Sequence, residues 1–319
     1  MMHPLNTRGL ILILRNGSES MNLRAFASIC CLVLNPQLAQ SQDMPLTQVL
    51  IDGEEWELLA EGFRFTEGPA VSKTGNVFFT DPPNNSIHWI GLDGKVSLVT
   101  DQSGRTSGLM MGPDERLYGC SREARQIVAW TTDGTKSVIA NVPDCNDLVV
   151  SSSGAIWFTD PSSQQVRYIS PDGKQSVVAE GFRPNGIILW PDESTLVVTD
   201  SDEPHLWTFR VEKDGTLSHK DRYYMPLQIP GGKKKPGSDG MTVDKDFRLY
   251  VATHAGIQMF DPTGRLGGTI AKPQRKFLSN ICFGGPGLNY LYATTADKVY
   301  RRKVKPTGAP YILKDNVIR

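Results

Sequence analysis

The sequence has no excess of charge, few cysteines and no apolar stretch long enough to span a membrane. Its 319 residues contain 34 Lys and Arg against 34 Asp and Glu. A chain without net charge lacks the electrostatic signature of nucleic-acid or membrane-surface binding, so we expect neither partner. The hydrophobic fraction of 39% is too high for a disordered chain. These absences leave a globular protein, whose oligomeric state the composition does not define.

The five cysteines form no recognisable framework. Two of them, Cys30 and Cys31, lie near the N-terminus, and the other three, Cys120, Cys145 and Cys282, are an odd number at distant spacings. Such spacing supports neither a disulfide framework nor a Cys-x-x-Cys zinc site. The Gly-x-Ser-x-Gly elbow of serine hydrolases and the His-Glu-x-x-His helix of zinc proteases are also absent. Two common hydrolytic mechanisms are therefore excluded.

The N-terminus indicates a secretory signal peptide. Met21–Arg24 give a positive start, Ala25–Leu34 form an apolar run of ten residues, and Ala39-Gln40-Ser41 place small residues at a cleavage site. This run is too short to span a bilayer. We expect residues 1–41 to be a leader and residues 42–319 to be one exported domain, periplasmic or secreted. The alternative is a misassigned start followed by disordered residues.

Glycine and proline are abundant, with 30 and 21 residues, and a strand motif repeats along the chain. Strand-like segments begin at residues 77, 117, 156, 196, 249 and 291, at intervals of 40, 39, 40, 53 and 42 residues. Several short strands and turns within a period near 40 are typical of β-propeller blades. The sequence therefore predicts an all-β fold, a six-bladed β-propeller of four-stranded antiparallel blades.

Two segments depart from the simple repeat. Residues 55–60 resemble the outer strand of a blade but precede the first blade. We expect them to form the outermost strand of the last blade, because this closes the ring and removes exposed edges. The long interval contains about 13 extra residues around residues 229–237. We expect these residues to form a surface loop between blades four and five.

A polar residue stands at the start of every predicted inner strand. Blade by blade, these residues are Glu67, Ser107, Asn146, Asn185, Asp239 and Asn280. Since inner strands line the channel of a propeller, the six side chains are expected to form one ring around its axis. Carboxylates and amides converging there are costly to bury without a cation. Their hard oxygen donors predict a central site for one divalent metal ion, Ca²⁺ first, with Mg²⁺, Mn²⁺ or Zn²⁺ as alternatives. Turn capping is the competing interpretation.

The topology places further side chains at the same mouth of the channel. Loops from second to third strands, and from fourth to first strands, surround the ring. Together with two ring positions, they give the candidate substrate-binding residues Ser107, Arg122, Arg183, Asp200, His254 and Asn280. For each residue alone, a solvated or turn-capping role is the competing interpretation.

Five motifs in this arrangement resemble those of a known family. They are Phe65-Thr-Glu-Gly-Pro69, Asn146-Asp-Leu-Val-Val150, Ile156-Trp-Phe-Thr-Asp-Pro161, Arg183-Pro-Asn-Gly-Ile187 and Ser238-Asp-Gly-Met-Thr-Val243. They resemble the motifs of the senescence marker protein/gluconolactonase family, the regucalcin-like six-bladed propellers. The resemblance implies hydrolysis of sugar lactones or, as in some relatives, of other lactones or organophosphate esters. It also implies metal ligation by Glu67, Asn146, Asn185 and Asp239.

Three functions remain open at this point. The first is a metal-dependent lactonase acting on a small-molecule lactone, in which the ion polarises the carbonyl. In this mechanism Asp239 is both ligand and catalytic base for the attacking water, as the resemblance suggests, and Asp200 is the second choice as base. The second function is a metal-stabilised propeller that binds a partner or sugar without turnover. The third is a metal-dependent phosphotriesterase that uses the same ring.

Overall fold

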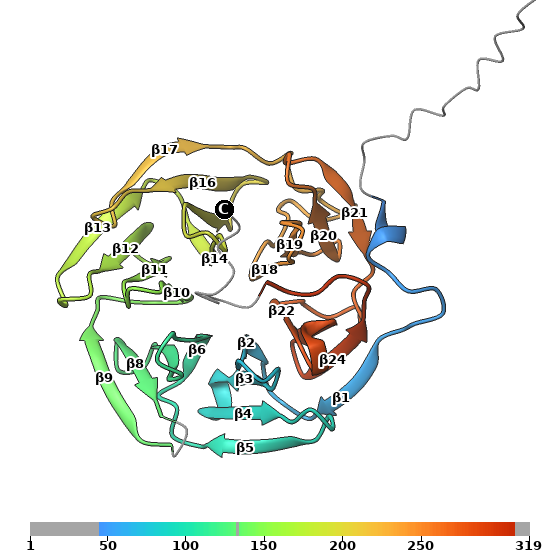
Figure 1. Cartoon of the computed structure of the whole chain (residues 1–319), viewed down its shortest axis with the longest axis horizontal. Helices are drawn as coiled ribbons and strands as arrows, with labels where there is room; N and C mark the ends of the chain where they lie inside the picture. The colour runs from blue at the N-terminus through green and yellow to red at the C-terminus, as the bar shows by residue number, and fades with distance from the viewer. Residues whose placement is uncertain (1–44, 132–133, 310–319) are drawn as a thin grey trace, which may run out of the picture. The chain divides into compact units, whose positions relative to one another are not determined.

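The computed structural model describes residues 45–131 and 134–309. Within these residues, the strands form six four-stranded antiparallel sheets arranged as blades around an axis (Figure 1). The predicted all-β, six-bladed propeller is therefore confirmed. The predicted leader, residues 1–41, lies outside the described residues and stays a prediction. None of the helices in the described ranges is long and apolar enough to cross a membrane.

The first five blades are meanders whose strands follow chain order from the axis outwards. Blade one contains β2 (Glu67–Val71), β3 (Val77–Asp81), β4 (Ser86–Ile90) and β5 (Val96–Thr100). Blade two contains β6 (Thr106–Met111), β7 (Leu117–Ser121), β8 (Gln126–Trp130) and β9 (Lys136–Asn141). Blade three contains β10 (Leu148–Val150), β11 (Ile156–Asp160), β12 (Gln165–Ile169) and β13 (Gln175–Glu180).

The remaining blades follow the same plan, with a change at the end. Blade four contains β14 (Pro184–Leu189), β15 (Thr195–Asp200), β16 (Leu206–Val211) and β17 (Leu217–Asp221). Blade five contains β18 (Met241–Val243), β19 (Leu249–Ala252), β20 (Ile257–Phe260) and β21 (Leu266–Ile270). Blade six contains β22 (Asn280–Gly284), β23 (Tyr290–Thr295), β24 (Lys298–Lys303) and, as its outermost strand, β1 (Glu57–Glu61). Three single-turn 3₁₀ helices complete the list: η1 (Leu46–Gln48), η2 (Pro82–Asn84) and η3 (Pro286–Leu288).

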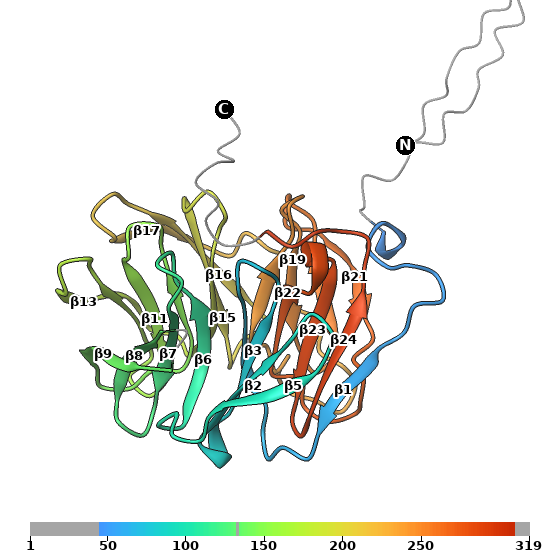
Figure 2. The same ribbon diagram turned by 60° about the horizontal axis from the view of Figure 1, so that its bottom comes forward.

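The ring is closed by the first strand of the described chain. Strand β1 pairs with β24 antiparallel, and Figure 2 shows the two strands side by side at the edge of blade six. The Arg301 guanidinium donates to the Glu57 carboxylate over 2.7 Å and 3.1 Å, which reinforces the pairing. The expectation that residues 55–60 supply the last outer strand is confirmed, although the strand begins two residues later and ends one residue later than predicted.

Burial falls from the axis to the outside of each blade. Strands β7 and β11 are buried along their whole length, because each lies between neighbouring blades and packs on both faces. The outer strands β5 and β9 alternate between partly buried and exposed residues. Their sequences follow this gradient in part, since polar residues are more frequent in β9 than in β11, which is Ile-Trp-Phe-Thr-Asp.

The insertion between blades four and five is a loop, as predicted. It covers residues 222–240, from the end of β17 to the start of β18. The loop is anchored by apolar side chains, because Tyr224 and Leu227 are buried in the same cluster as Phe260. The rings of Tyr224 and Phe260 meet edge to face with centroids 5.5 Å apart.

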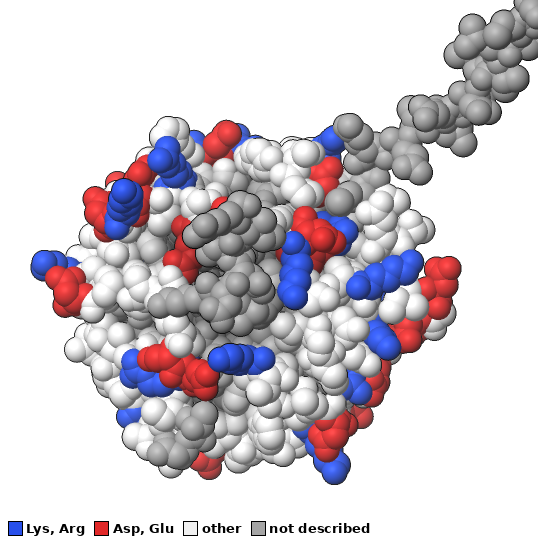
Figure 3. Space-filling model, viewed as in Figure 1, with Lys and Arg blue, Asp and Glu red and all other residues white. Residues whose placement is uncertain are grey.

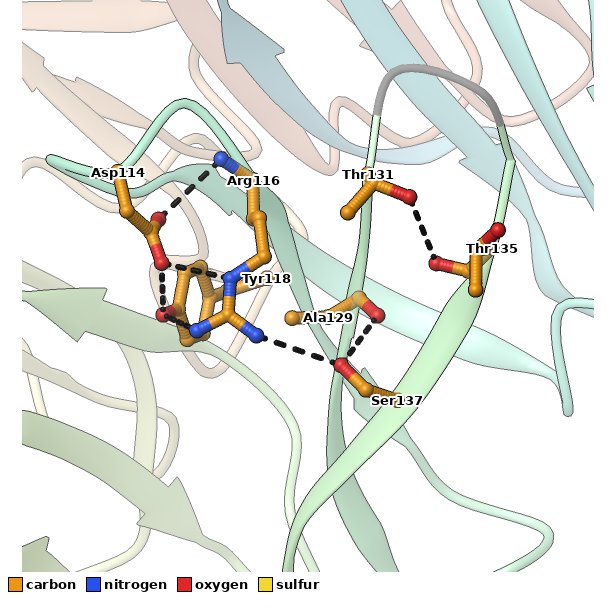
Figure 4. A network of polar contacts seen from close by, with 7 residues as sticks. All are labelled: Asp114, Arg116, Tyr118, Ala129, Thr131, Thr135 and Ser137. Atoms are coloured by element: carbon orange, nitrogen blue, oxygen red, sulfur yellow. Dashed lines mark hydrogen bonds and ion pairs between the residues drawn. The ribbon is translucent and has the colours of Figure 1, made fainter.

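A repeated polar network holds the turn between the first and second strands in two blades. In blade two, the Asp114 carboxylate accepts hydrogen bonds from Arg116 Nε over 2.6 Å and from the Tyr118 hydroxyl over 2.9 Å (Figure 4). In blade five, Asp244 plays the same part with Arg248 and Tyr250. These turns lie at the end of the inner strands that is opposite the predicted ring.

Charges of both signs are distributed around the rim of the face in Figure 3, in keeping with a chain of zero net charge.

The same end of the channel is covered by the segment 304–309. Lys245 N donates to Thr307 O over 2.9 Å, Gly308 N to Leu288 O over 2.8 Å, and Ala309 N to Val243 O over 3.1 Å. Beneath this segment, apolar side chains of the inner strands enclose a cavity of about 40 Å³ that reaches Asp147 and Asn280. The mouth with the polar ring is therefore the end at which a substrate can enter.

Candidate active site

All six predicted ring residues lie at the same end of the inner strands. Glu67 and Asn280 are the first residues of β2 and β22, and Ser107 and Asn185 are the second residues of β6 and β14. Asn146 and Asp239 come two residues before β10 and β18. The Ser107 hydroxyl donates to the backbone carbonyl of Asn146, so this side chain braces the next blade.

Threonines of the second strands fix the backbone of the ring. Thr80 Oγ1 donates to Ser107 O over 2.9 Å, and Thr159 Oγ1 donates to Asn185 O over 2.8 Å. Each bond runs from one blade to the ring residue of the next blade. The Thr-Asp ending of the second strands, visible as a repeat in the sequence, therefore positions ring residues.

Glycines next to the ring residues allow neighbouring blades to approach closely. A Cβ atom on Gly240 would overlap the Asn280 side chain, and one on Gly186 would overlap the Asp239 carbonyl. A side chain at either position would push two ring residues apart. In blade three the corresponding residue is Asp147 instead of glycine, so a third carboxylate joins the two that the repeat predicts.

The three carboxylates interact with one another in a site of low exposure. Burial raises the pKa of Glu67 to about 7 and that of Asp147 to about 7, the latter also through repulsion by Glu67. Burial also raises the pKa of Asp239 well above its usual range, and the charges of Glu67 and Asp147 raise it further. Hydrogen bonds from the Asn280 amide lower the pKa of Glu67 and Asp147 and offset part of this effect.

The donors around these carboxylates fit a divalent cation. Asn185 Oδ1 is buried and has no hydrogen-bond partner in the described structure, and no described residue donates a hydrogen bond to the Asp239 carboxylate. Unsatisfied oxygens of this kind are costly unless a cation or another donor reaches them. In the described part of the chain, no three His, Cys, Asp or Glu side chains are grouped closely enough to hold an ion by themselves. An ion would therefore need amide oxygens as well, which the asparagines of the ring provide.

Asp200, the second choice as catalytic base, is engaged in a turn. Its Oδ2 accepts a hydrogen bond from Trp207 Nε1 over 3.1 Å, and its Oδ1 accepts one from Asp202 N over 3.0 Å. Asp81 and Asp160, at the same position in blades one and three, likewise accept backbone hydrogen bonds. This geometry favours a turn-capping role for the aspartates that end the second strands.

Two predicted arginines lie at the rim and are about half exposed. Arg122 Nη2 is 3.7 Å from Asp144 Oδ2, and Arg183 Nη1 is 4.0 Å from Asp202 Oδ1. Arg122 is close enough to the ring to lower the pKa of Glu67 through its charge. It also lines an open cavity of about 590 Å³, whose walls include Pro82, Pro83, Arg105, Arg122, Arg125 and Asp144. A larger hollow of about 1280 Å³ lies on the outer strands of blade four and contains no ring residue.

His254 belongs to an aromatic group on the other side of the mouth. Its ring meets Phe277 edge to face at 5.5 Å, and Phe277 stacks with Phe65 at 6.2 Å. Burial and the charges of two nearby lysines lower the pKa of His254, which keeps the imidazole neutral near pH 7. The group provides an apolar wall with one polar nitrogen.

The family can be decided once this geometry is combined with a match to a family model. The model of the SMP-30/Gluconolactonase/LRE-like region matches residues 65–297, which is well over half of the chain. The chain belongs to this family. The match begins two residues before Glu67 and ends one residue before β24, the third strand of blade six, so it contains the whole ring. The resemblance recognised in the sequence motifs is thereby confirmed.

Several named proteins are similar to this chain over most of its length. A gluconolactonase of Zymomonas mobilis is 29% identical over 299 residues, covering 79% of this chain and 82% of that protein. The solved structure of a gluconolactonase from Xanthomonas campestris is 26% identical, with a TM-score of 0.72, and the match covers 81% of this chain and 92% of that chain. A diisopropyl-fluorophosphatase of Loligo vulgaris is 25% identical over 246 residues, covering 62% and 75%.

Two side chains at the site were not among the sequence candidates. Asp147 adds the third carboxylate, and the signal for it was its place in the repeat, where four other blades have glycine. Phe277 joins His254 to Phe65, and no repeat marks it, because it lies in the irregular loop before β22. The roles of the predicted metal, catalytic and substrate-binding residues stay predictions, although the structure assembles the six ring positions at one mouth.

Proposed function

We propose that this protein is a metal-dependent lactonase that opens a sugar lactone or a related lactone, as the names of its gluconolactonase relatives suggest. The observation that carries the proposal is the concentration of Glu67, Asp147 and Asp239 at one mouth, with Asn185 Oδ1 unpartnered beside them. A purely structural channel has no need for three mutually repelling carboxyl groups. A divalent cation, Ca²⁺ first, suits this set of oxygen donors.

In the proposed mechanism, Glu67, Asn146, Asn185 and Asp239 would hold the ion. When bound, the ion supplies the positive charge that keeps the carboxylates ionised and polarises the lactone carbonyl. Asp239 accepts the proton of the attacking water, because its carboxylate is free of hydrogen bonds from the described residues. Asp147 accepts a hydrogen bond from Leu148 N over 2.9 Å and contributes negative charge from below the ring.

The walls of the mouth orient the substrate in this proposal. Arg122 lies on one side, next to the cavity of about 590 Å³, and donates to hydroxyl or ring oxygens of the lactone. His254 and Phe277 form the opposite wall and pack against the carbon skeleton. A small cyclic ester with several hydroxyl groups matches a mouth that combines arginine, amide and aromatic side chains.

The decisive experiment is an assay of the purified protein on glucono-δ-lactone and a panel of lactones, with and without a chelator. We expect turnover that the chelator removes and that added Ca²⁺ restores. Asp239→Asn should abolish turnover, whereas Asp200→Asn, the matched aspartate at the rim, should retain most of it. Turnover that persists in the chelator, or the reverse ranking of the two variants, would contradict the mechanism.

A phosphotriesterase is the second candidate, because the Loligo vulgaris relative is named a diisopropyl-fluorophosphatase. Both activities require an electrophile next to a cation and a base at the same ring. Adding diisopropyl fluorophosphate to the panel separates the two: faster hydrolysis of this compound than of every lactone would favour the phosphotriesterase. If Ca²⁺ binds but no substrate is turned over, the propeller is a binding module.

A further inference from the structure

Two of the buried cysteines, which are far apart in the sequence, meet in the structure. Cys120 lies on β7 of blade two, and Cys145 lies in the segment between β9 and β10. Both side chains are fully buried, and both belong to the same hydrophobic cluster. The spacing of the cysteines did not suggest a pair, because it gives no information about which blades face each other.

One hydrogen bond and the register of two strands place the two cysteines close together. Cys145 Sγ donates to Gln126 O over 3.7 Å, and Gln126 is paired with Ser121, the residue after Cys120. Burial raises the pKa of the Cys120 thiol and the Cys145 thiol raises it further, which agrees with two thiols that lie close together. Both cysteines are free thiols in the structure.

The third described cysteine provides a contrast. Cys282 lies on β22 in blade six, where its neighbours in the core are Val77, Phe79 and Tyr292. It is buried like the other two, but no thiol lies against it among the described residues. Burial alone therefore does not distinguish the pair, whereas the closeness of a second cysteine does.

We propose that Cys120 and Cys145 form a reversible disulfide bond that ties blade two to the segment carrying Asn146. Cys145 immediately precedes Asn146, whose carbonyl accepts a hydrogen bond from Gly108 N over 2.8 Å. The disulfide bond would therefore restrain the backbone at Asn146, a residue of the polar ring. This inference goes beyond the proposed function, since it depends on neither the metal nor the substrate.

The reaction requires an external disulfide, such as oxidised glutathione, as the oxidant. The thiolate of one cysteine attacks this disulfide and gives a mixed disulfide, with release of one reduced glutathione. The second cysteine then attacks the protein sulfur of the mixed disulfide and displaces the second glutathione. Two protein thiols are oxidised, one glutathione disulfide is reduced to two thiols, and the two protons of the cysteines pass to the two glutathione thiolates.

The geometry and burial of the pair determine how the bond forms and what it does. The two sulfur atoms must approach to about 2.0 Å, which small side-chain rotations can provide. Since both side chains are fully buried, the oxidant reaches them during folding or local opening. The cross-link restricts the unfolded chain between residues 120 and 145, so the oxidised protein should be more stable than the reduced protein.

The test is peptide mapping of the full chain after refolding. The protein is unfolded in reductant and refolded in a buffer of oxidised and reduced glutathione, so that burial does not limit access. Free thiols are then blocked, and the non-reduced digest is analysed by mass spectrometry. We expect a linked peptide pair containing Cys120 and Cys145, which disappears on reduction, and Cys282 in blocked form.

Three variants separate the proposal from general effects of cysteine. Cys282→Ser should keep the linked pair and the higher melting temperature in oxidised than in reduced glutathione. Cys120→Ser and Cys145→Ser should each lose both properties. If the refolded wild type has the native circular dichroism spectrum but leaves Cys120 and Cys145 free, or joins either to another cysteine, the proposal is wrong. This readout is independent of lactone turnover, and the wild-type map decides the question even if a variant does not fold.

Discussion

Two buried aspartates at opposite ends of one inner strand have opposite environments. Asp244 follows β18, is fully buried, and accepts hydrogen bonds from Arg248 Nη1 over 2.7 Å and the Tyr250 hydroxyl over 2.8 Å. Asp239 precedes β18, is almost as buried, and faces Glu67 and Asp147 instead of a cation. The same residue type in the same blade is thus hydrogen-bonded by neighbouring side chains at one end and repelled by neighbouring carboxyl groups at the other.

The difference shows how a repeat fold separates stability from chemistry. The polar groups at the Asp244 end are neutralised by groups that the chain itself supplies, as in the related network of Asp114 in blade two. The Asp239 end brings together carboxylates and an unpartnered amide oxygen. A ligand that binds to these groups would therefore stabilise the folded state. Substitutions at the two ends should therefore have opposite effects on activity and stability.

The largest effect is expected for Asp239→Asn. We expect the kcat for lactone hydrolysis to fall by about 10³-fold, because the base is lost. The free energy of unfolding of the metal-free variant should not fall, because the substitution removes one of three carboxyl groups whose ionisation is opposed by burial and mutual repulsion. Steady-state kinetics and urea unfolding in chelator measure the two quantities. If Asp239→Asn lost activity because it was less stable than the wild type, Asp239 and Asp244 would not differ in role, and this account would be contradicted.

Asp244→Asn should instead reduce stability. The substitution removes the charge of the buried carboxylate from the Arg248 guanidinium, whose side chain is 7% exposed, and leaves it paired with the exposed carboxylate of Asp246. We expect a loss of about 3 kcal/mol in the free energy of unfolding, measured by urea denaturation. The matched control is Asp114→Asn, because Arg116 is 32% exposed and water can replace the lost contact. The control should lose about 1 kcal/mol or less, and equal losses would contradict this account of burial.

The pH dependence of stability should differ between metal-free and Ca²⁺-loaded protein. Glu67 and Asp147 have pKa values of about 7 in the folded chain without an ion, whereas unfolded carboxyl groups titrate near pH 4. The folded state therefore binds more protons between these values, and the stability of the metal-free protein should fall as the pH rises from about 4 to about 7. Melting temperatures measured in chelator test this. Asp147→Asn should flatten the profile, and saturating Ca²⁺ should remove the fall, because the ion prefers the ionised carboxylates.

The smallest effect is expected for a methyl group at the ring. Gly240→Ala places a Cβ atom against the Asn280 side chain and should cost about 1–3 kcal/mol in the free energy of unfolding. Gly231→Ala, in the loop between blades four and five, meets no atom within 4 Å and serves as the control. Thermal unfolding compares the two variants. If both behave alike, close approach between blades does not depend on glycine at this position.

Features that recur in every blade could be predicted from the sequence. The period near 40 residues defined six blades, and the pattern of residues 55–60 indicated the strand that closes the last one. The polar residues before the inner strands were found because they occupy one position of the repeat. Their meeting at one mouth follows from the topology, since all inner strands start at the same end.

Features that depend on contacts between blades could not be predicted in this way. Phe277 lies in a loop of irregular length, and its stacking with Phe65 joins blades six and one. Cys120 and Cys145 meet because the segment after β9 returns beneath the middle strands, which a one-dimensional repeat does not describe. Asp147 was visible in the sequence, but its effect on Glu67 and Asp239 depends on distances across the channel.

The pairing of β1 with β24 has a consequence for biosynthesis. Glu57 pairs with Arg301, so the ring joins residues that are made at nearly opposite times during translation. Blade six cannot be completed on the ribosome until β24 has left the exit tunnel, and the earlier blades must wait with an open edge. If residues 1–41 are a leader that directs export, as the sequence predicts, this delay would keep the chain unfolded enough to pass through a translocation channel. Closure would then occur after transport, on the far side of the membrane.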